Sequence, residues 1–304
     1  MTTAGFSFVR YLRSKTTIDD RALNKDVKGR LCETLAGIDY PIRVLEIGAG
    51  LGTMVRRLLH WGAIRNARYT LLDVDPELLG AARTGLMEMA HQNNFTILDN
   101  PPQLLLQGAG YDLTIEMVQA ELTDFLEVAR SNDPVDLVVA SSFLDLVDVS
   151  STLPRLFDLV KPGGLFWFCV NFDGDTIFVP ETADDAHFVN IYHRSMDQRQ
   201  WRGHRAGDSR TGRHLFEQLP AAGAAIVAAG ASDWVVCPFE GQYIQDEGYF
   251  LHCIIRTMEL ELKKHSDADS TRLTKWVELR HTQIDNNQLT YIAHQLDFFG
   301  RTRS

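Results

Sequence analysis

Residues 44–53 read Val-Leu-Glu-Ile-Gly-Ala-Gly-Leu-Gly-Thr, an apolar run that contains one acid and ends in three alternating glycines. Val44, Leu45 and Ile47 are typical of a parallel strand that is buried on both faces. Glycine allows a sharp turn, positive φ and close approach of the backbone to a ligand, and a helix-compatible stretch follows from Thr53. The pattern predicts a strand, a tight turn and a helix, the local structure of a nucleotide-type cofactor site.

The spacing of the glycines separates two cofactor classes. The dinucleotide fingerprint has glycine at its first, third and sixth positions, but the sixth position counted from Gly48 is Thr53, which disfavours a dehydrogenase. Glu46 followed by Gly-x-Gly-x-Gly resembles the first motif of class I S-adenosylmethionine-dependent methyltransferases. The resemblance implies S-adenosylmethionine as cofactor, S-adenosylhomocysteine as product, and cofactor-binding roles for Glu46, Gly48, Ala49, Gly50 and Gly52.

A second apolar run, residues 69–73, also ends in an acid. Asp73 follows Gly48 by 25 residues, close to the offset of about 20 at which an acid after the second strand meets a ribose hydroxyl. A carboxylate accepts hydrogen bonds from both cis hydroxyls. Asp75 precedes Pro76, the pattern of a helix N-cap followed by proline. We therefore assign the ribose to Asp73, with Val74 beside the cofactor.

Two further apolar runs lead to polar residues. Residues 113–119 lead to Glu121, and residues 136–140 lead to Ser141. In the resembled family an acid or amide after the third strand often contacts the adenine amine, which implies this role for Glu121 with Leu122 beside it; a solvated loop acid is an equally supported interpretation. Ser141 corresponds to the position that often lines the methyl-transfer cleft. The Asn/Asp-Pro-Pro-aromatic motif of enzymes that methylate base or glutamine amides does not occur here, which disfavours those classes.

The alternation of strand and helix patterns predicts an α/β fold with a parallel sheet. A fifth strand is expected at residues 165–170, after a Lys-Pro-Gly-Gly turn. The resemblance implies a sixth strand at 225–236 with a break at Gly230, and a seventh at 289–299. The expected fold is a Rossmann-like seven-stranded sheet, mostly parallel with an antiparallel last strand, and helices on both faces.

Two units are expected along the chain. Residues 1–40 are predicted to form an N-terminal helical lid segment, in which Tyr11 and Arg21 are substrate candidates or, alternatively, parts of a helix packed on the sheet edge. Residues 41–304 are predicted to form the methyltransferase domain, with a cap or substrate insertion at about 172–210. This insertion follows the fifth strand and is longer than a simple crossover needs.

The predicted insertion carries an arginine cluster. Arginine presents a planar fork suited to carboxylate or phosphate, so the substrate pocket is predicted to accept an anionic group, with Tyr192, Arg194 and Arg199 as substrate residues. The alternative is a salt-bridged surface segment. Between His193 and His214 the six arginines are Arg194, Arg199, Arg202, Arg205, Arg210 and Arg213.

Histidine and cysteine spacing bears on catalysis and on metals. His187 and His193, in the predicted insertion, are the candidates for a general base. The ten histidines include no HxxxH or HxH pair, and no metal site is predicted. The cysteines show no metal-ligand spacing and are expected to be reduced and structural: Cys32, Cys169, Cys237 and Cys253.

Composition limits the partners. A formal net charge of −10 works against nucleic acid, whose binding depends on phosphate neutralisation by lysine and arginine. No apolar run is long enough to span a bilayer and no signal-peptide pattern is present, so no membrane partner and a cytoplasmic location are expected. The sequence does not specify the oligomeric state.

These features together predict S-adenosylmethionine-dependent O- or N-methylation of a small-molecule acceptor. An aminopropyltransferase is disfavoured because its glycine motif differs from Gly-Ala-Gly-Leu-Gly. A non-catalytic methyltransferase-like module that binds cofactor or a partner remains an alternative, since fold does not fix function, and a dehydrogenase is the less favoured one.

Overall fold

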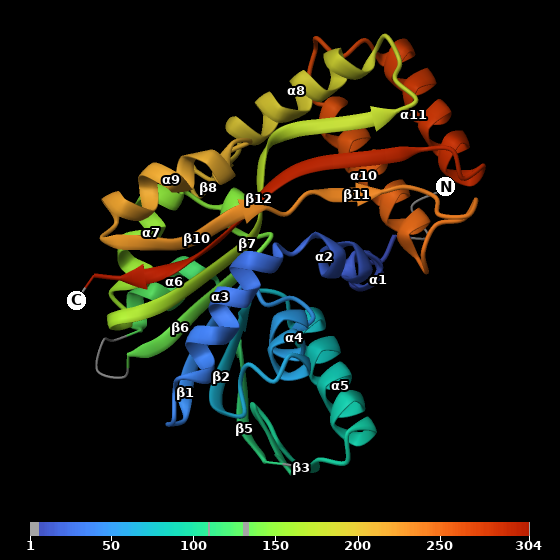
Figure 1. Ribbon diagram of the computed structural model, residues 1–304. Coiled ribbons are helices and arrows are strands. Elements are labelled where there is room, and N and C mark those ends of the chain that lie inside the picture. Colours follow the sequence, from blue (N-terminus) through green and yellow to red (C-terminus); the bar gives the residue numbers. More distant parts are fainter. Residues whose placement is uncertain (1–5, 109, 130–133, 304) are drawn as a thin grey trace.

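One mixed sheet forms the centre of the molecule (Figure 1). The computed structural model describes residues 6–108, 110–129 and 134–303, and there ten strands follow the order β10-β12-β7-β6-β1-β2-β5-β4-β3, with β11 paired to β12. β1 pairs in parallel with β2 and β6, β2 with β5, and β6 with β7, whereas β12 is antiparallel to β7 and β10. The strands are β1 (Ile42–Ile47), β2 (Asn66–Asp73), β3 (Thr96–Asn100), β4 (Gln103–Gly108), β5 (Tyr111–Gln119), β6 (Val135–Ser141), β7 (Val160–Val179), β10 (Ala224–Ala231), β11 (Trp234–Val236) and β12 (Thr290–Thr302).

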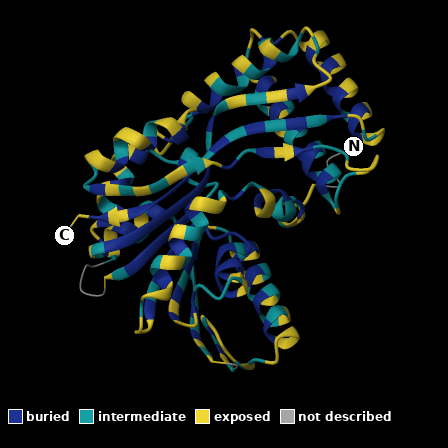
Figure 2. Cartoon of the chain, viewed as in Figure 1, coloured by how far each residue is buried: buried dark blue, intermediate teal, exposed yellow. Residues whose placement is uncertain are grey.

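Helices cover both faces of the sheet, as predicted. Successive strand residues point to opposite faces, so Val44 belongs to one apolar core and Leu45 to the other. The first core includes side chains of α3, α4 and α5, and the second includes side chains of α6, α7 and α9. Figure 2 shows the buried residues along the central strands. The helices are α1 (Phe8–Ser14), α2 (Thr16–Ala22), α3 (Lys25–Ala36), α4 (Thr53–His60), α5 (Pro76–Gln92), α6 (Leu122–Val128), α7 (Val149–Phe157), α8 (Asp185–Asp197), α9 (Thr211–Ala221), α10 (Glu247–Leu262) and α11 (Ser270–Asp285).

The fifth strand, β7, is much longer than the predicted residues 165–170. Its first half, residues 160–169, pairs with β6, and its pairing with β12 continues to Val179. The β7–β12 ribbon thereby extends beyond β6 and forms an upper lobe with α8, α10 and α11 (Figure 1). The predicted insertion at 172–210 begins within this ribbon, and the proposed division into two units remains a prediction.

The sixth strand breaks later than predicted. Gly230 stays within β10, and the break falls at Ser232 and Asp233, between β10 and β11. A Cβ at position 230 would lie 2.3 Å from Asn24 Nδ2, so glycine is needed here because α3 begins against the strand. The expectation of a turn at Gly230 is therefore wrong.

Three strands add to the seven predicted ones. β3 and β4 form an antiparallel hairpin that continues the sheet beyond β5, and β11 pairs with β12. A separate two-stranded hairpin, β8 (Gln200–Trp201) with β9 (His204–Arg205), lies in the predicted insertion. Within the described ranges, no helix has the length and apolar character required to cross a membrane.

Candidate functional site

A cavity of about 810 Å³ lies at the carboxyl ends of β1, β2, β5 and β6. This is where open α/β sheets bind ligands. Nine of the ten predicted cofactor residues line it, so the structure brings the separate sequence motifs together. These nine residues are Glu46, Gly48, Ala49, Gly50, Asp73, Val74, Glu121, Leu122 and Ser141.

The glycine turn after β1 has the backbone that the sequence predicts. Gly48, Gly50 and Gly52 have φ of 60°, 52° and 63°. A Cβ at Gly48 would lie 2.1 Å from the Phe143 ring, so this glycine lets the residue after β6 close onto the turn. Gly52 does not line the cavity; it is the N-cap residue of α4 and turns the chain into that helix.

Asp73 connects the second strand to the glycine turn. Its Oδ2 accepts a hydrogen bond from the Gly50 amide at 2.8 Å, and its Oδ1 accepts one from the Asp75 amide at 3.0 Å. Each carboxylate oxygen keeps a further lone pair for a hydroxyl donor. Asp75 caps α5 by accepting from the Glu77 amide, which confirms the N-cap predicted from the sequence.

Glu46 is a buried acid in the cavity wall. Burial raises its pKa to about 8, although its carboxyl accepts a hydrogen bond from the Tyr69 hydroxyl at 2.7 Å and such a bond favours the charged form. At neutral pH this carboxyl is mostly protonated. It therefore adds a neutral polar group, and not a full charge, to the site.

Glu121 has a structural role that neither sequence interpretation included. It is the N-cap residue of α6, and its carboxylate accepts hydrogen bonds from the Thr123 amide at 2.8 Å and the Asp124 amide at 3.3 Å. Capping satisfies amides that the first helical turn leaves free. Because Glu121 also lines the cavity, its assignment to the adenine amine remains a prediction.

The N-terminal helices close one side of the cavity with residues that the sequence reasoning missed. Four residues from this segment line the cavity: Phe8 and Leu12 on one face of α1, Lys15 between the two helices, and Asp19 on α2. Lys15 Nζ donates to Ser142 Oγ at 2.9 Å, which ties these helices to the end of β6.

The two predicted lid residues lie elsewhere. Tyr11 is adjacent in sequence to Leu12 and therefore lies on a different helix face; it stacks on Phe250 with ring centroids 5.7 Å apart. Arg21 forms an ion pair with the buried Glu247 at 2.6 Å. Neither residue lines the cofactor cavity. Their predicted role in substrate binding therefore remains a prediction.

The predicted insertion reaches the cavity through its hairpin. Trp201, Arg202 and Arg205 line the cavity, and Arg202 forms a 2.6 Å ion pair with Asp124 in which both side chains are exposed. The arginines of the predicted cluster that line the cavity are Arg202 and Arg205, which lie after α8 and not within it.

The predicted substrate residues on and just after α8 have different surroundings. Arg194 forms an exposed ion pair with Asp267. Arg199 is half-buried, and its charge acts on the nearby Asp145 and Tyr192. Burial raises the pKa of Tyr192. Arg199 and Tyr192 are thus near each other, but they lie outside the cavity lining.

The two candidate bases are also outside the lining. His187 Nε2 lies 3.1 Å from the Asp267 carbonyl oxygen. His193 Nε2 lies 3.1 Å from Thr176 Oγ1, and burial lowers the pKa of this imidazole. Their catalytic roles remain predictions that the apo geometry does not support. Among the described residues, no cluster of three or more His, Cys, Asp or Glu side chains could hold a metal ion.

Comparisons with known proteins agree with the cofactor side of this site. Residues 45–166 match the family model described as "Methyltransferase domain". A non-reducing polyketide synthase of Macrophomina phaseolina is 32% identical over 137 residues, 42% of this chain and 6% of that protein. A malonyl-[acyl-carrier protein] O-methyltransferase of Chlorobium luteolum is 30% identical over 149 residues, 49% of this chain and 46% of that protein. The chain thus spans less than half the length of these curated relatives.

Solved methyltransferase structures align over most of the chain at low identity. A S-adenosylmethionine-dependent methyltransferase of Methanosarcina mazei aligns over 89% of this chain and 97% of its own, with 11% identity and a TM-score of 0.47. Residues 45–166 form a methyltransferase domain. This domain confirms the predicted resemblance to S-adenosylmethionine-dependent methyltransferases, together with the enzyme class and the cofactor.

Proposed function

We propose that this protein transfers the methyl group of S-adenosylmethionine to an oxygen or nitrogen of a small-molecule acceptor that carries an anionic group. The observation that carries the proposal is a single cavity whose lining combines the glycine turn, Asp73 and Glu46 with apolar side chains and with four lysine and arginine side chains. The glycine turn and the Asp73 carboxylate fit an adenosyl cofactor, whose ribose offers two hydroxyl donors. The sulfonium of that cofactor supplies an already activated methyl group.

The substrate end of the cavity supports the anionic acceptor. Phe143, Leu146 and Trp201 give it an apolar wall, and Lys15, Arg155, Arg202 and Arg205 give it cations. An exposed ion pair is worth little, so Arg202 can exchange Asp124 for a substrate carboxylate or phosphate at small cost. The relative named as an O-methyltransferase favours oxygen as the acceptor atom.

The residues of this chain would act mainly by alignment and by excluding water. Side chains of α1 and of the β8–β9 hairpin, together with Lys15, line the same cavity as the strand ends. Holding two reactants in a near-attack geometry supplies about 7 to 11 kcal/mol of the barrier. A general base is needed only where the acceptor must lose a proton.

Calorimetric titration with S-adenosylhomocysteine tests the cofactor half of this proposal. Asp73→Asn should weaken binding about tenfold, because one charged acceptor of hydrogen bonds becomes a neutral amide. Asp39→Asn, an exposed position before β1, is the matched control and should bind like the wild type. Binding of NAD in place of the adenosyl ligands would favour the dehydrogenase alternative.

A screen of carboxylated and phosphorylated acceptors tests the catalytic half. Formation of S-adenosylhomocysteine that depends on an anionic acceptor supports the proposal. Tight cofactor binding without turnover of any acceptor would favour the non-catalytic module. Turnover of neutral acceptors alone would contradict the proposal that the substrate carries an anionic group.

A further inference from the structure

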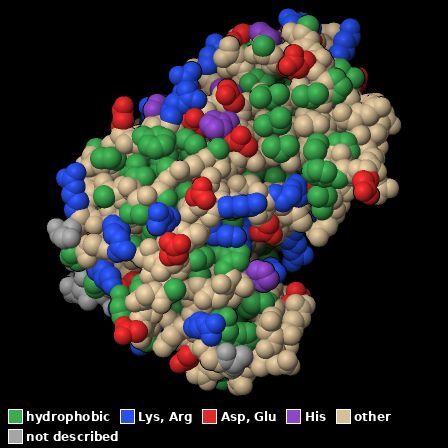
Figure 3. All heavy atoms as spheres, viewed as in Figure 1, with side chains coloured by type: hydrophobic (Ala, Val, Ile, Leu, Met, Phe, Trp, Pro, Cys, Tyr) green, Lys and Arg blue, Asp and Glu red, His purple; other side chains and the backbone are tan. Residues whose placement is uncertain are grey.

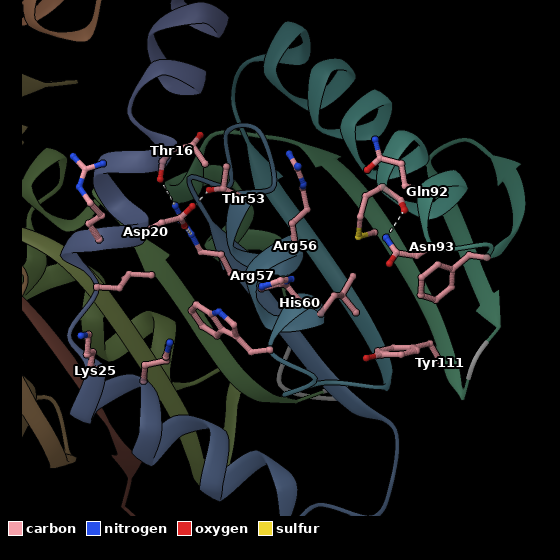
Figure 4. Close-up of a pocket in the computed structure, with 17 residues that line it drawn as sticks. Thr16, Asp20, Lys25, Thr53, Arg56, Arg57, His60, Gln92, Asn93 and Tyr111 are labelled. Carbon is pink, nitrogen blue, oxygen red and sulfur yellow. Dashed lines mark hydrogen bonds and ion pairs between the residues drawn. The ribbon is translucent and has the colours of Figure 1, made fainter. Parts of the chain in front are cut away.

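A second cavity, of about 930 Å³, lies between α2, α3, α4 and the end of α5 (Figure 4). Its volume is in the range of about 300 to 1,000 Å³ that is usual for small-molecule sites. The cofactor motifs do not line it, apart from Thr53 at the start of α4, which lines both cavities. The methyl-transfer proposal leaves this cavity without a role.

The lining of this second cavity is basic in an acidic protein. The chain has a formal net charge of −10, yet among the described residues the cavity has a single acidic lining residue, Asp20. Figure 3 shows Lys and Arg side chains gathered over the region where Figure 1 draws α2, α3 and α4. The basic lining residues are Arg21, Lys25, Lys28, Arg56, Arg57 and His60.

Part of this positive charge is available to a ligand. Arg57 and Arg21 already bind carboxylates, with Arg57 Nε 2.6 Å from Asp20 Oδ1 and Arg21 Nη1 2.6 Å from Glu247 Oε1. Lys25 and Arg56 are exposed and make no ion pair with a carboxylate in the part of the chain that the structure describes. Such cations favour an anion, and the arginine fork matches phosphate oxygens.

The rest of the lining suits an organic group. Phe95 and Tyr111 pack edge to face with ring centroids 5.4 Å apart, and Trp61 lies beneath the Lys28 ammonium at 4.8 Å. In Figure 4, Lys25 lies on one side of the cavity and Tyr111 on the other. Aromatic faces and edges stack on flat rings, so the two sides of the cavity differ in the chemistry they accept.

We propose that this second cavity binds an organic phosphate, with the phosphate group at Lys25 and Lys28, which lie about one turn apart on α3, and a flat organic part against the neighbouring Trp61. The inference does not depend on the proposed methyl transfer. Its test uses the protein without cofactor, so failure of one proposal does not imply failure of the other.

Calorimetric titration with phenyl phosphate and with inorganic phosphate, at low ionic strength to limit screening, tests the site. Lys25→Met combined with Lys28→Met should weaken phenyl phosphate binding at least tenfold. Lys275→Met combined with Arg301→Met removes the same charge from exposed positions outside the cavity and should leave binding unchanged. Trp61→Leu should weaken phenyl phosphate binding while leaving inorganic phosphate binding unaffected.

Three results would overturn the proposal. The first is no saturable binding of phenyl phosphate to the wild type. The second is an equal loss in the two double variants, which would reveal a general charge effect. The third is equal affinity for phenyl phosphate and inorganic phosphate together with no effect of Trp61→Leu, which would show that the cavity does not bind the organic part of the ligand.

Discussion

The two sides of the cofactor cavity are built in different ways. On the cofactor side each residue stands at the end of a strand or in the turn that follows it, as with Gly48 after β1 and Asp73 at the end of β2. On the opposite side the walls come from segments far apart in the sequence, joined by contacts such as Lys15 with Ser142 and Arg202 with Asp124. The first side follows from local chain geometry, whereas the second requires the folded molecule.

The upper lobe, formed by the β7–β12 ribbon with α8, α10 and α11, is stabilised by a buried ion pair of its own. Arg280 on α11 is fully buried, forms an ion pair with Asp185 on α8 and donates to the Pro180 carbonyl at 2.8 Å. Its guanidinium also lies over the Phe178 ring at 5.0 Å. These residues lie away from the cofactor cavity, so the lobe can be destabilised separately.

Arg280→Met should give the largest effect. Removing one partner of a buried ion pair typically costs about 3 to 5 kcal/mol, and here it leaves Asp185 without its buried cation. We expect the free energy of unfolding to fall by about that amount, measured by urea denaturation, while S-adenosylhomocysteine affinity of the folded protein changes less than about twofold. Lys275→Met, exposed on the same helix, is the control. A large loss of cofactor affinity would contradict the separation of the two regions.

Glu46→Gln should change how stability depends on pH. The folded-state pKa of about 8 lies above the unfolded value of 4.5, so the stability linked to this group is fully present below pH 4.5 and is lost as pH rises through 8. Between these two pH values the free energy of unfolding should fall by on the order of 3 to 5 kcal/mol because of this group. Urea unfolding from pH 4.5 to 8.5 should show a steeper fall for the wild type than for Glu46→Gln.

The matched control for this pH series is Glu33→Gln, whose side chain is exposed on α3. It should follow the wild-type curve. If Glu46→Gln also followed that curve, the Glu46 carboxyl would have no raised pKa in the folded protein.

Gly48→Ala tests the cofactor side directly. An alanine at φ of 60° would have its Cβ 2.1 Å from the Phe143 ring, and the left-handed conformation alone costs about 1 to 2 kcal/mol. We expect a fall of about 2 kcal/mol in unfolding free energy and at least tenfold weaker S-adenosylhomocysteine binding by calorimetry. Gly80→Ala, on an open face of α5, should instead add up to about 1 kcal/mol. Unchanged cofactor affinity in Gly48→Ala would show that the turn tolerates displacement of Phe143.

The sequence allowed prediction of those parts whose geometry is local. The positive φ of the glycine turn and the Asp75 cap depend on neighbouring residues, and the mostly parallel sheet with an antiparallel last strand follows from the family resemblance. The orientation of α1 could not be derived from its sequence, because Tyr11 and Leu12 are both largely apolar. Tyr11 stacks on Phe250 of α10, and this tertiary contact leaves Leu12 to line the cofactor cavity. Gly230 was misinterpreted for the same reason, since Asn24 approaches it from another element.

The same limit explains the substrate candidates. Residues 201, 202, 205 and 206 of the predicted insertion line the cavity, but the individual arginines of the cluster lie in different environments. Arg194 binds Asp267 at the surface, whereas Arg202 lies on the hairpin at the cavity mouth. Which arginine faces a ligand depends on how the hairpin docks against α6, and this docking is a tertiary contact that no spacing pattern encodes.

The smallest predicted effect is a coupling between the two cavities. Arg57 Nε binds Asp20 in the second cavity at 2.6 Å, and its Nη2 lies 3.8 Å from Asp19, which lines the cofactor cavity. We expect a phosphate beside Lys25 to compete with Asp20 for this guanidinium and so to shift α2, which carries Asp19 into the lining of the cofactor cavity. We expect phenyl phosphate at saturation to change S-adenosylhomocysteine affinity about three- to fivefold, close to 1 kcal/mol of coupling.

Linkage requires that the cofactor product change phenyl phosphate affinity by the same factor, so calorimetry in both orders checks the coupling internally. Arg57→Lys keeps the charge but loses the fork that reaches both acids, and it should reduce the coupling while each ligand still binds. A phenyl phosphate effect that never saturates would mean competition for the cofactor cavity. A coupling factor of one, with both ligands bound, would show that the two regions are energetically independent despite sharing Thr53 and despite the Arg57–Asp19 ion pair.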